Sequence, residues 1–541
     1  MADSGLRDVV IIGGGHNGLV CAAYLASAGL KVTVLERRGV VGGAAVTEEF
    51  HPGFRNSVAA YTVSLLNPKV IRDLDLPRHG LRVVERRLSN FLPLDDTRYL
   101  KIGGGRTEQE VAKFSARDAA RLAEYGERLD LIADVLRDLV LETPPNVTAG
   151  GWLEALPELL RSARLGKRIA KLDMAMRREL LDLFVKSAGD YLDGWFESAP
   201  IKAAYGFDGI VGNYASPYAG GSAYVLLHHV FGEVNGKKGA WGHAIGGMGA
   251  ISQAMARAAA ERGVDIRVSS PVREVIVEAG RAVGVVMEDG VALRARSVVS
   301  NLNPKLLYGK LIDASVLERN FRERMNNWRC GSGTFRMNVA LSELPDFKAL
   351  PGRTLAEHHT SGIIMAPSLA YMDQAYLDAK SGGWSKQPIV EMLIPSTLDD
   401  SLAPAGRHVA SLFCQHVAPV LPDGASWDDH RDEVAELMIE LVNSHAPNFK
   451  ASVVGRQIMS PLDLERTFGL IGGDIFHGAL SLDQLFSARP MLGHGDYRGP
   501  LKGLYMCGSG THPGGGVTGA PGHNAAREII ADFRRGRLKQ A

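Results

Sequence analysis

Three glycines near the N-terminus have the spacing of a loop that holds a phosphate group. Gly13, Gly15 and Gly18 lie in GGGHNG, which matches G-x-G-x-x-G. In such a loop the first glycine permits a tight turn, the second lets the backbone approach a pyrophosphate, and the third lets a helix pack closely on a strand. The N–H groups at the start of that helix can then bind the phosphates. The loop, with Asn17 inside it, predicts a dinucleotide site.

Glu36 supplies the second part of this predicted site. It ends the apolar run KVTVLE, where a carboxylate can accept hydrogen bonds from both hydroxyls of an adenosine ribose. This chemistry fits NAD and FAD equally. In glutathione-reductase-like flavoproteins, a second Gly-Gly turn brings backbone amides to the pyrophosphate and ribitol. Gly42 and Gly43 stand where that turn is expected, and an ordinary turn is the alternative. We assign the adjacent Arg37 and Ala44 to the same site.

The elements that must position these residues follow one another in the right order. An apolar run at 9–12 predicts a strand, LVCAAYLASAG predicts a helix, and KVTVLE predicts a second strand. This order favours a nucleotide-binding unit. A purely structural βαβ unit, without a ligand, is the alternative.

A second glycine-rich stretch, GSGTHPGGGVTGAPG, begins at Gly508. The apolar run GLYMC precedes it, and GHNAAREIIADFRR after it has a helical pattern. The stretch is therefore expected to be a strand-to-helix crossover, which is a binding position and not a linker. Its own G-x-G-x-x-G match at 514–519 is discounted, because no strand directly precedes it.

The unit at 238–304 predicts a return to the same sheet. It reads as a glycine-rich turn, a helix over 249–262 and several strands, with Val272 placed to bind adenine through its backbone. We therefore expect an α/β protein with a discontinuous, Rossmann-like FAD-binding domain and an inserted α+β substrate domain that carries a helical cap. The expected boundaries are 1–75, 238–310 and 490–541 for the first domain, and 76–237 and 311–489 for the second.

Together these segments resemble the phytoene-desaturase-related FAD oxidoreductases over nearly the whole chain, less clearly at 105–240. The resemblance implies noncovalent FAD, with its diphosphate at the first loop, its ribose at Glu36 and its ribitol near Gly42 and Gly43. It also implies that Gly508 approaches the ribitol phosphate. Gly519 and Ala520 would begin the last helix under the flavin N1/O2 edge, where the helix dipole stabilises negative charge.

The resemblance further implies hydride transfer between flavin N5 and a lipophilic, polyene or isoprenoid-like substrate. Such a substrate needs few catalytic side chains. His512 in THPG and His477 in IFHG are weak catalytic candidates, with a structural role as the alternative. Tyr214 and Tyr218 are expected in the core or in a pocket wall. A flavin-binding interaction protein with weak or lost catalysis, and an amine oxidase, remain open as alternatives.

Composition narrows the other function classes. The chain has 541 residues and a net charge of +1, so no global charge favours nucleic acid. Its four cysteines form no CxxC pair, and no cluster has metal-ligand spacing. The first strand is expected so early that no signal peptide precedes it. No run is apolar enough to span a membrane, so we expect a cytoplasmic protein. Its oligomeric state cannot be read from the sequence.

The segment 161–178, RSARLGKRIAKLDMAMRR, is strongly basic. Leu165, Ile169, Leu172 and Met176 would share one face if the segment were a helix. A basic amphipathic helix can lie on an anionic membrane. A solvated face on a cap helix is the alternative.

Overall fold

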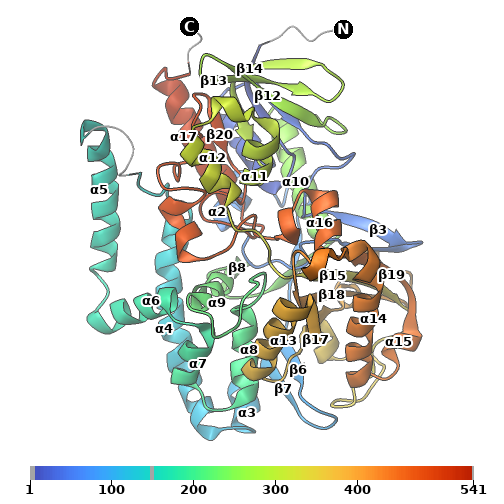
Figure 1. The fold of residues 1–541 in the computed structure, drawn as a ribbon. Coiled ribbons are helices and arrows are strands. Elements are labelled where there is room, and N and C mark those ends of the chain that lie inside the picture. Colours follow the sequence, from blue (N-terminus) through green and yellow to red (C-terminus); the bar gives the residue numbers. More distant parts are fainter. Residues whose placement is uncertain (1–5, 147–151, 539–541) are drawn as a thin grey trace.

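The computed structural model describes residues 6–146 and 152–538. Its first sheet is parallel in its central part, with the strand order β11-β2-β1-β14-β20. The strands are β1 (Arg7–Ile12), β2 (Val32–Leu35), β11 (Asp265–Arg267), β14 (Ala292–Ser300) and β20 (Leu504–Met506). They come from three separate stretches of the chain (Figure 1).

Three helices pack around this sheet: α1 (His16–Ser27), α10 (Met248–Glu261) and α17 (Ala520–Arg534). The strands read as continuous apolar runs because helices or strands cover both of their faces. Val9 and Ile11 lie in a core with α1 and α10, whereas Val10 and Ile12 point into a second core. An antiparallel extension, β12 (Val272–Glu278) and β13 (Arg281–Met287), continues from the N-terminal half of β14.

A second, mixed sheet lies apart from the first, with the order β19-β15-β18-β17-β16-β6-β7 (Figure 1). Only β16 and β6 pair in parallel within it. Its strands are β6 (Leu88–Pro93), β7 (Tyr99–Gly103), β15 (Phe335–Leu341), β16 (Gly362–Met365), β17 (Trp384–Leu393), β18 (His408–Val417) and β19 (Val453–Met459). The helices α13 (Leu369–Gly382) and α14 (Trp427–His445) pack on it.

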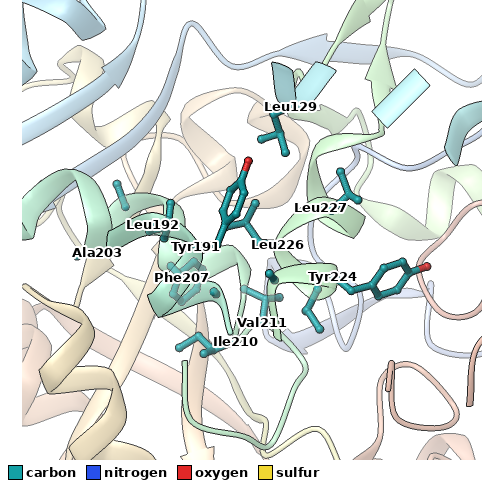
Figure 2. Packing of buried hydrophobic residues seen from close by; sticks show 14 of the residues in the cluster. Leu129, Tyr191, Leu192, Ala203, Phe207, Ile210, Val211, Tyr224, Leu226 and Leu227 are labelled. Atoms are coloured by element: carbon teal, nitrogen blue, oxygen red, sulfur yellow. The ribbon is translucent and has the colours of Figure 1, made fainter. Parts of the chain in front are cut away.

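A helical part completes the molecule (Figure 1). It contains α3 (Thr107–Ala112), α4 (Ala116–Val140), α5 (Trp152–Ile169), α6 (Met174–Val185), α7 (Ala188–Trp195), α8 (Ala199–Asp208) and α9 (Ser222–Val230). Ser115 caps α4 by accepting a hydrogen bond from the Asp118 backbone. Figure 2 shows how Leu129, Tyr191, Phe207 and Leu227, each from a different helix, meet in one core.

Smaller elements connect these layers. They are β3 (Thr47–His51), β4 (Phe54–Ser57), α2 (Pro68–Asp73), β5 (Val83–Glu85), β8 (Glu233–Val234), β9 (Lys237–Lys238), β10 (Gly242–Ala244), α11 (Pro304–Leu306), α12 (Arg319–Asn326), α15 (Phe449–Ser452) and α16 (Pro461–Phe468). No helix within the described ranges is both long and apolar enough to cross a bilayer.

The basic segment 161–178 is not one helix, and the shared face expected for it is wrong. Helix α5 ends at Ile169, and α6 begins at Met174. Asp173 caps α6 by accepting from the Met176 backbone, and Arg177 donates to the carbonyl oxygens of Leu172 and Ala170. These bonds favour a break over a continuous helix, because they satisfy backbone groups at the new terminus.

Candidate active site

A cavity of about 1530 Å³ opens where the parallel strands end. Gly13 follows β1, Glu36 follows β2 and Asn301 follows β14 at its wall. This edge of an open α/β sheet is where ligands bind in such folds. The predicted site residues that line it are Gly13, Gly15, Asn17, Glu36, Arg37, Gly42, Gly43, Ala44 and Val272.

The first two glycine turns are joined by their backbones. Gly15 and Gly42 form an isolated β-bridge, and the Gly42 amide donates to the Gly14 carbonyl at 2.9 Å. A Cβ at Gly15 would lie 2.6 Å from Asn301 Nδ2, and one at Gly42 would lie 2.6 Å from the Ala45 carbonyl oxygen. Side chains are therefore excluded here, and the two turns form one narrow backbone cradle.

Glu36 is buried at the floor of this cavity. Its Oε2 accepts from the Gly14 amide at 2.8 Å, and its Oε1 accepts from the Arg38 amide at 2.9 Å. Each carboxylate oxygen keeps a lone pair for another donor, so the expected bonds to ribose hydroxyls stay possible.

Arg37 plays a different part from the one expected of a direct ligand. Its guanidinium donates to the carbonyl oxygens of Arg466 and Thr467. It thereby holds the segment 467–470, which forms another wall of the same cavity.

Four predicted residues lie outside the cavity wall. A Cβ on Gly18 would lie 2.4 Å from the Gly13 carbonyl oxygen, and one on Gly508 would lie 2.7 Å from the Asn301 carbonyl oxygen. Gly519, at φ +72°, directly precedes α17, which begins at Ala520. These residues shape the backbone behind the wall, and their contact with a flavin stays a prediction.

Two buried polar atoms at this wall lack a partner among the described residues. Asn17 donates to Ser509 Oγ at 3.3 Å, but its Oδ1 accepts nothing, and His16 Nε2 is also unpaired. Buried polar atoms in folded proteins are nearly always satisfied. A dinucleotide would bring hydroxyls and polar ring atoms to this wall, so the residues present fit such a cofactor.

A second cavity adjoins the first. His16, Ala44, His477 and Ser509 belong to the walls of both. The other wall residues of the second cavity are Ala59, Ala60, Tyr61, Thr62, Val63, Ser64, Leu65, Val211, His229, Trp241, Met248, Ile251, Ile475, Phe476, Gly516 and Val517. Most of these side chains are apolar, and none is a carboxylate, a lysine or an arginine.

The histidines at this wall are neutral near neutral pH. Burial lowers the pKa of His16, His229 and His477 to about 4. His477, at φ +57°, has an Nδ1 that finds no partner in the described chain. The sequence did not identify His16 as a site residue, because it occupies a variable position of the glycine motif. Its place at the start of the predicted helix was the one signal that could have pointed to it.

His512 takes the structural role that was one of its two expected roles. It lines neither of these cavities but a separate groove behind the loop, beside Phe486 and α17. Its Nε2 lies 3.1 Å from the Leu139 carbonyl oxygen, and burial lowers its pKa to about 4. A hydrogen-bonding role therefore accounts for this histidine.

Neither tyrosine singled out from the sequence lines the two cavities. Tyr214 packs against Tyr376 and His416. Tyr218 is 41% exposed.

Arg489, which sequence reasoning missed, holds the site together. Its fully buried guanidinium donates to the carbonyl oxygens of Ser509, Phe476 and Ala479, among others. Burial lowers its pKa to about 10, so it stays charged at neutral pH. These bonds tie the last glycine loop to the segment that carries His477. Within the described residues, no group of acidic, cysteine or histidine side chains could hold a metal ion.

Comparison with known proteins agrees with this geometry. Residues 18–334 match the family described as flavin containing amine oxidoreductase. The chain is 41% identical to "Pyridine nucleotide-disulfide oxidoreductase domain-containing protein 2" of Rattus norvegicus, over 97% of this chain and 94% of that protein. Despite that name, the four cysteines here are all free.

More distant relatives also match this chain over nearly its whole length. A subunit of limonene dehydrogenase from Castellaniella defragrans is 26% identical, over 97% of this chain and 95% of that one. A 4,4'-diapophytoene desaturase of Methylomonas is 25% identical, over 94% and 92%. These matches confirm the resemblance to phytoene desaturases.

Solved structures share the fold. An oxidoreductase from Methanosarcina mazei superposes with a TM-score of 0.60 at 16% identity, covering 97% of this chain and all of that one. A variant of putrescine oxidase gives 0.60 at 15% identity, covering 98% and 99%. The chain therefore belongs to the flavin containing amine oxidoreductase family, has a Rossmann-like FAD-binding fold and uses FAD as its cofactor.

Proposed function

We propose that this protein transfers hydride between FAD and a lipophilic, polyene or isoprenoid-like substrate, as a desaturase, saturase or isomerase. The observation that carries the proposal is the largely apolar cavity that shares a wall with the cofactor cavity. Bound FAD supplies a hydride acceptor or donor at its N5 atom.

The side chains of the second cavity suit such a substrate. Val63, Met248 and Ile251 offer apolar contact, and the neutral His16 and His477 add no charge. An apolar wall excludes water and would hold a hydrocarbon chain by burial, without ion pairs.

The walls of this cavity also support a substrate role for the inserted segments. Val211 and His229 come from the helical part, and Phe476 comes from the chain after the second sheet. We therefore assign 76–237 and 311–489 to a substrate domain, whose helices form the cap.

The names of two relatives point the same way. One refers to limonene and the other to diapophytoene, and both compounds are lipophilic. A cavity next to the cofactor also speaks against the alternative of an interaction protein without catalysis, because such a protein has no need for it.

Amine oxidation is the second candidate, favoured by aromatic side chains. Tyr61, Trp241 and Phe476 line the cavity, and aromatic faces can bind a cationic or neutral amine. The family description also names amines. A carboxylate that would attract a cationic amine is missing from the wall.

Anaerobic mixing separates these candidates. The purified, FAD-loaded protein is mixed with carotenoid precursors and cyclic terpenes in detergent micelles, and separately with primary and polyamines, while the visible flavin absorbance is followed. The FAD is also reduced chemically and mixed with unsaturated polyenes, to test the saturase direction. For a desaturase or a saturase we expect a redox change of the flavin with an isoprenoid, and for an isomerase an isomerised isoprenoid at unchanged flavin absorbance. We expect neither result with the amines. Bleaching by amines alone would overturn the proposal in favour of amine oxidation.

A further inference from the structure

We propose that the outward face of α5 and α6 docks on a membrane that contains anionic lipid. The outward face is defined by the exposed apolar side chains Leu156, Leu159, Leu160, Met174, Leu181 and Val185. This inference rests on exposed side chains and does not depend on the proposed reaction.

Helix α5 is turned the opposite way from an ordinary surface helix. Leu156, Leu159 and Leu160 are 52–57% exposed. Its charged Arg161 and Arg168 face the body instead, 3.9 Å from Glu528 and Glu142. Surface helices normally direct their apolar stripe at the core and their charges at water. The reversed orientation indicates that the leucines meet a surface outside this chain.

The contacts of α5 with the body show which face of the helix is turned inward. The helix stands off at one side of the molecule (Figure 1). A groove of about 1360 Å³ lies beneath it, lined by Leu165, Arg161 and Arg168 on the helix side. Turning the exposed leucines toward the body would move Arg161 and Arg168 away from it and leave Glu142 and Glu528 without those partners.

Helix α6, which follows α5 in the chain, also exposes apolar side chains. Met174, Leu181 and Val185 recur at the spacing of one helical face and are all exposed. On its other face, Leu183 is buried and Phe184 packs against Tyr224 of α9. Helix α9 also carries His229 of the apolar cavity. Helix α6 therefore packs directly against a helix that lines the apolar cavity.

The charges beside the outward face indicate which kind of surface it binds. Lys167, Lys171 and Arg178 are exposed next to the apolar side chains. Leucines flanked by lysines and arginines are typical of helices that lie in the interface of anionic bilayers. A symmetric pair of this chain would bring two copies of all these cations into one interface, which is repulsive. An anionic lipid surface therefore fits better than a second copy.

Vesicle sedimentation tests this proposal with the full-length, FAD-loaded protein. The probes are vesicles of phosphatidylcholine alone and of phosphatidylcholine mixed with phosphatidylserine. We expect binding to the mixed vesicles that weakens as salt rises, because exposed charges are screened over about 8–10 Å at physiological salt. The variant Leu156→Gln/Leu159→Gln/Leu160→Gln should lower binding at least about tenfold, the change that follows from losing the apolar contact.

Two further variants make the result specific. Lys167→Glu/Lys171→Glu should abolish the preference for phosphatidylserine. The matched control Leu377→Gln/Val420→Gln/Leu492→Gln removes exposed apolar side chains elsewhere and should bind as the wild type does. All variants should keep their FAD. Equal binding by the leucine variant and the control, or no binding of the wild type even at low salt, would overturn the proposal. A dimer that the leucine variant converts to monomer would instead identify a second copy as the occupant.

Discussion

At the residue scale, Gly15 is constrained from two sides. The cofactor must approach its backbone, and Asn301 Nδ2 already occupies the place where a Cβ would lie. We predict that Gly15→Val removes FAD from the purified protein, because the branched side chain fills the cradle. The FAD-to-protein ratio after gel filtration measures this.

A double substitution separates the two causes. Gly15→Ala combined with Asn301→Ala removes the nearest obstacle to the new methyl group. If the pair folds with the wild-type melting temperature and still lacks FAD, the loss belongs to the cradle. If Gly15→Val itself retains FAD at wild-type stoichiometry, this loop does not bind the cofactor.

The attachment of FAD is a second prediction at this scale. No Cys or His in the glycine loops matches an attachment pattern expected from the family resemblance. Acid precipitation should therefore release all of the yellow colour into the supernatant. Colour that stays in the protein pellet would show a covalent flavin.

At the element scale, α1 and α17 pack closely against each other because a glycine lies at their contact. A Cβ at Gly522 would lie 2.2 Å from the Asn17 carbonyl oxygen. We predict that Gly522→Ala lowers the free energy of unfolding by about 1–3 kcal/mol, the usual cost of overpacking. It should also weaken FAD binding, because Asn17 bonds to Ser509 at the cavity wall.

Gly126→Ala is the matched control for that prediction. Gly126 lies inside α4 with nothing near the place of its Cβ. Alanine at this position should raise the free energy of unfolding by about 0.5–1 kcal/mol, because alanine has a higher helix propensity than glycine. Denaturant unfolding of the two variants compares them, and a neutral Gly522→Ala would show that the helices can separate freely.

These elements also show what the sequence could and could not predict. The strands and helices around the first and last glycine stretches follow from local periodicity, and they were predicted correctly. Asn301 and Arg489 could not be found, because their roles depend on contacts with residues far away in the chain. The break between α5 and α6 was missed, although Asp173 carried a local capping signal that competes with the helical pattern.

The second cavity lay wholly beyond sequence reasoning. Its wall gathers residues from 16 to 517, and no periodicity brings such distant positions together. His477 was included among the candidates from its motif alone. His512 had the same kind of support, and the fold turned it toward Leu139 instead.

At the scale of the whole molecule, buried histidines predict acid sensitivity. Burial lowers the pKa of His229 and His477 to about 4 and that of His416 to about 3, from a usual value of 6.5. Between pH 6.5 and 4 the unfolded chain therefore binds more protons than the folded one. The free energy of unfolding should fall as pH drops through this window, by on the order of 1–2 kcal/mol per histidine.

Unfolding by urea at about pH 7.5 and about pH 5 measures this loss. His416→Phe should reduce it, because both ring nitrogens of His416 are buried without a partner in the described chain. His430→Gln, at a partly exposed position, should leave this loss unchanged. An equal pH dependence in all three proteins would contradict the assignment to buried imidazoles.

The most direct test of the whole account is to fill the apolar cavity without touching the cofactor cavity. Ala60 lines only the former, so Ala60→Phe should place a phenyl ring where the substrate lies. Lipids are extracted from cells that produce the wild type, Ala60→Phe, or the exposed control Val420→Phe. We expect FAD in all three proteins. We also expect that the wild type and the control change the degree of unsaturation of an isoprenoid-like lipid in the cells, and that Ala60→Phe does not. If Ala60→Phe holds FAD and alters the same lipid as fully as the wild type does, the apolar cavity is not the substrate site and the central claim fails.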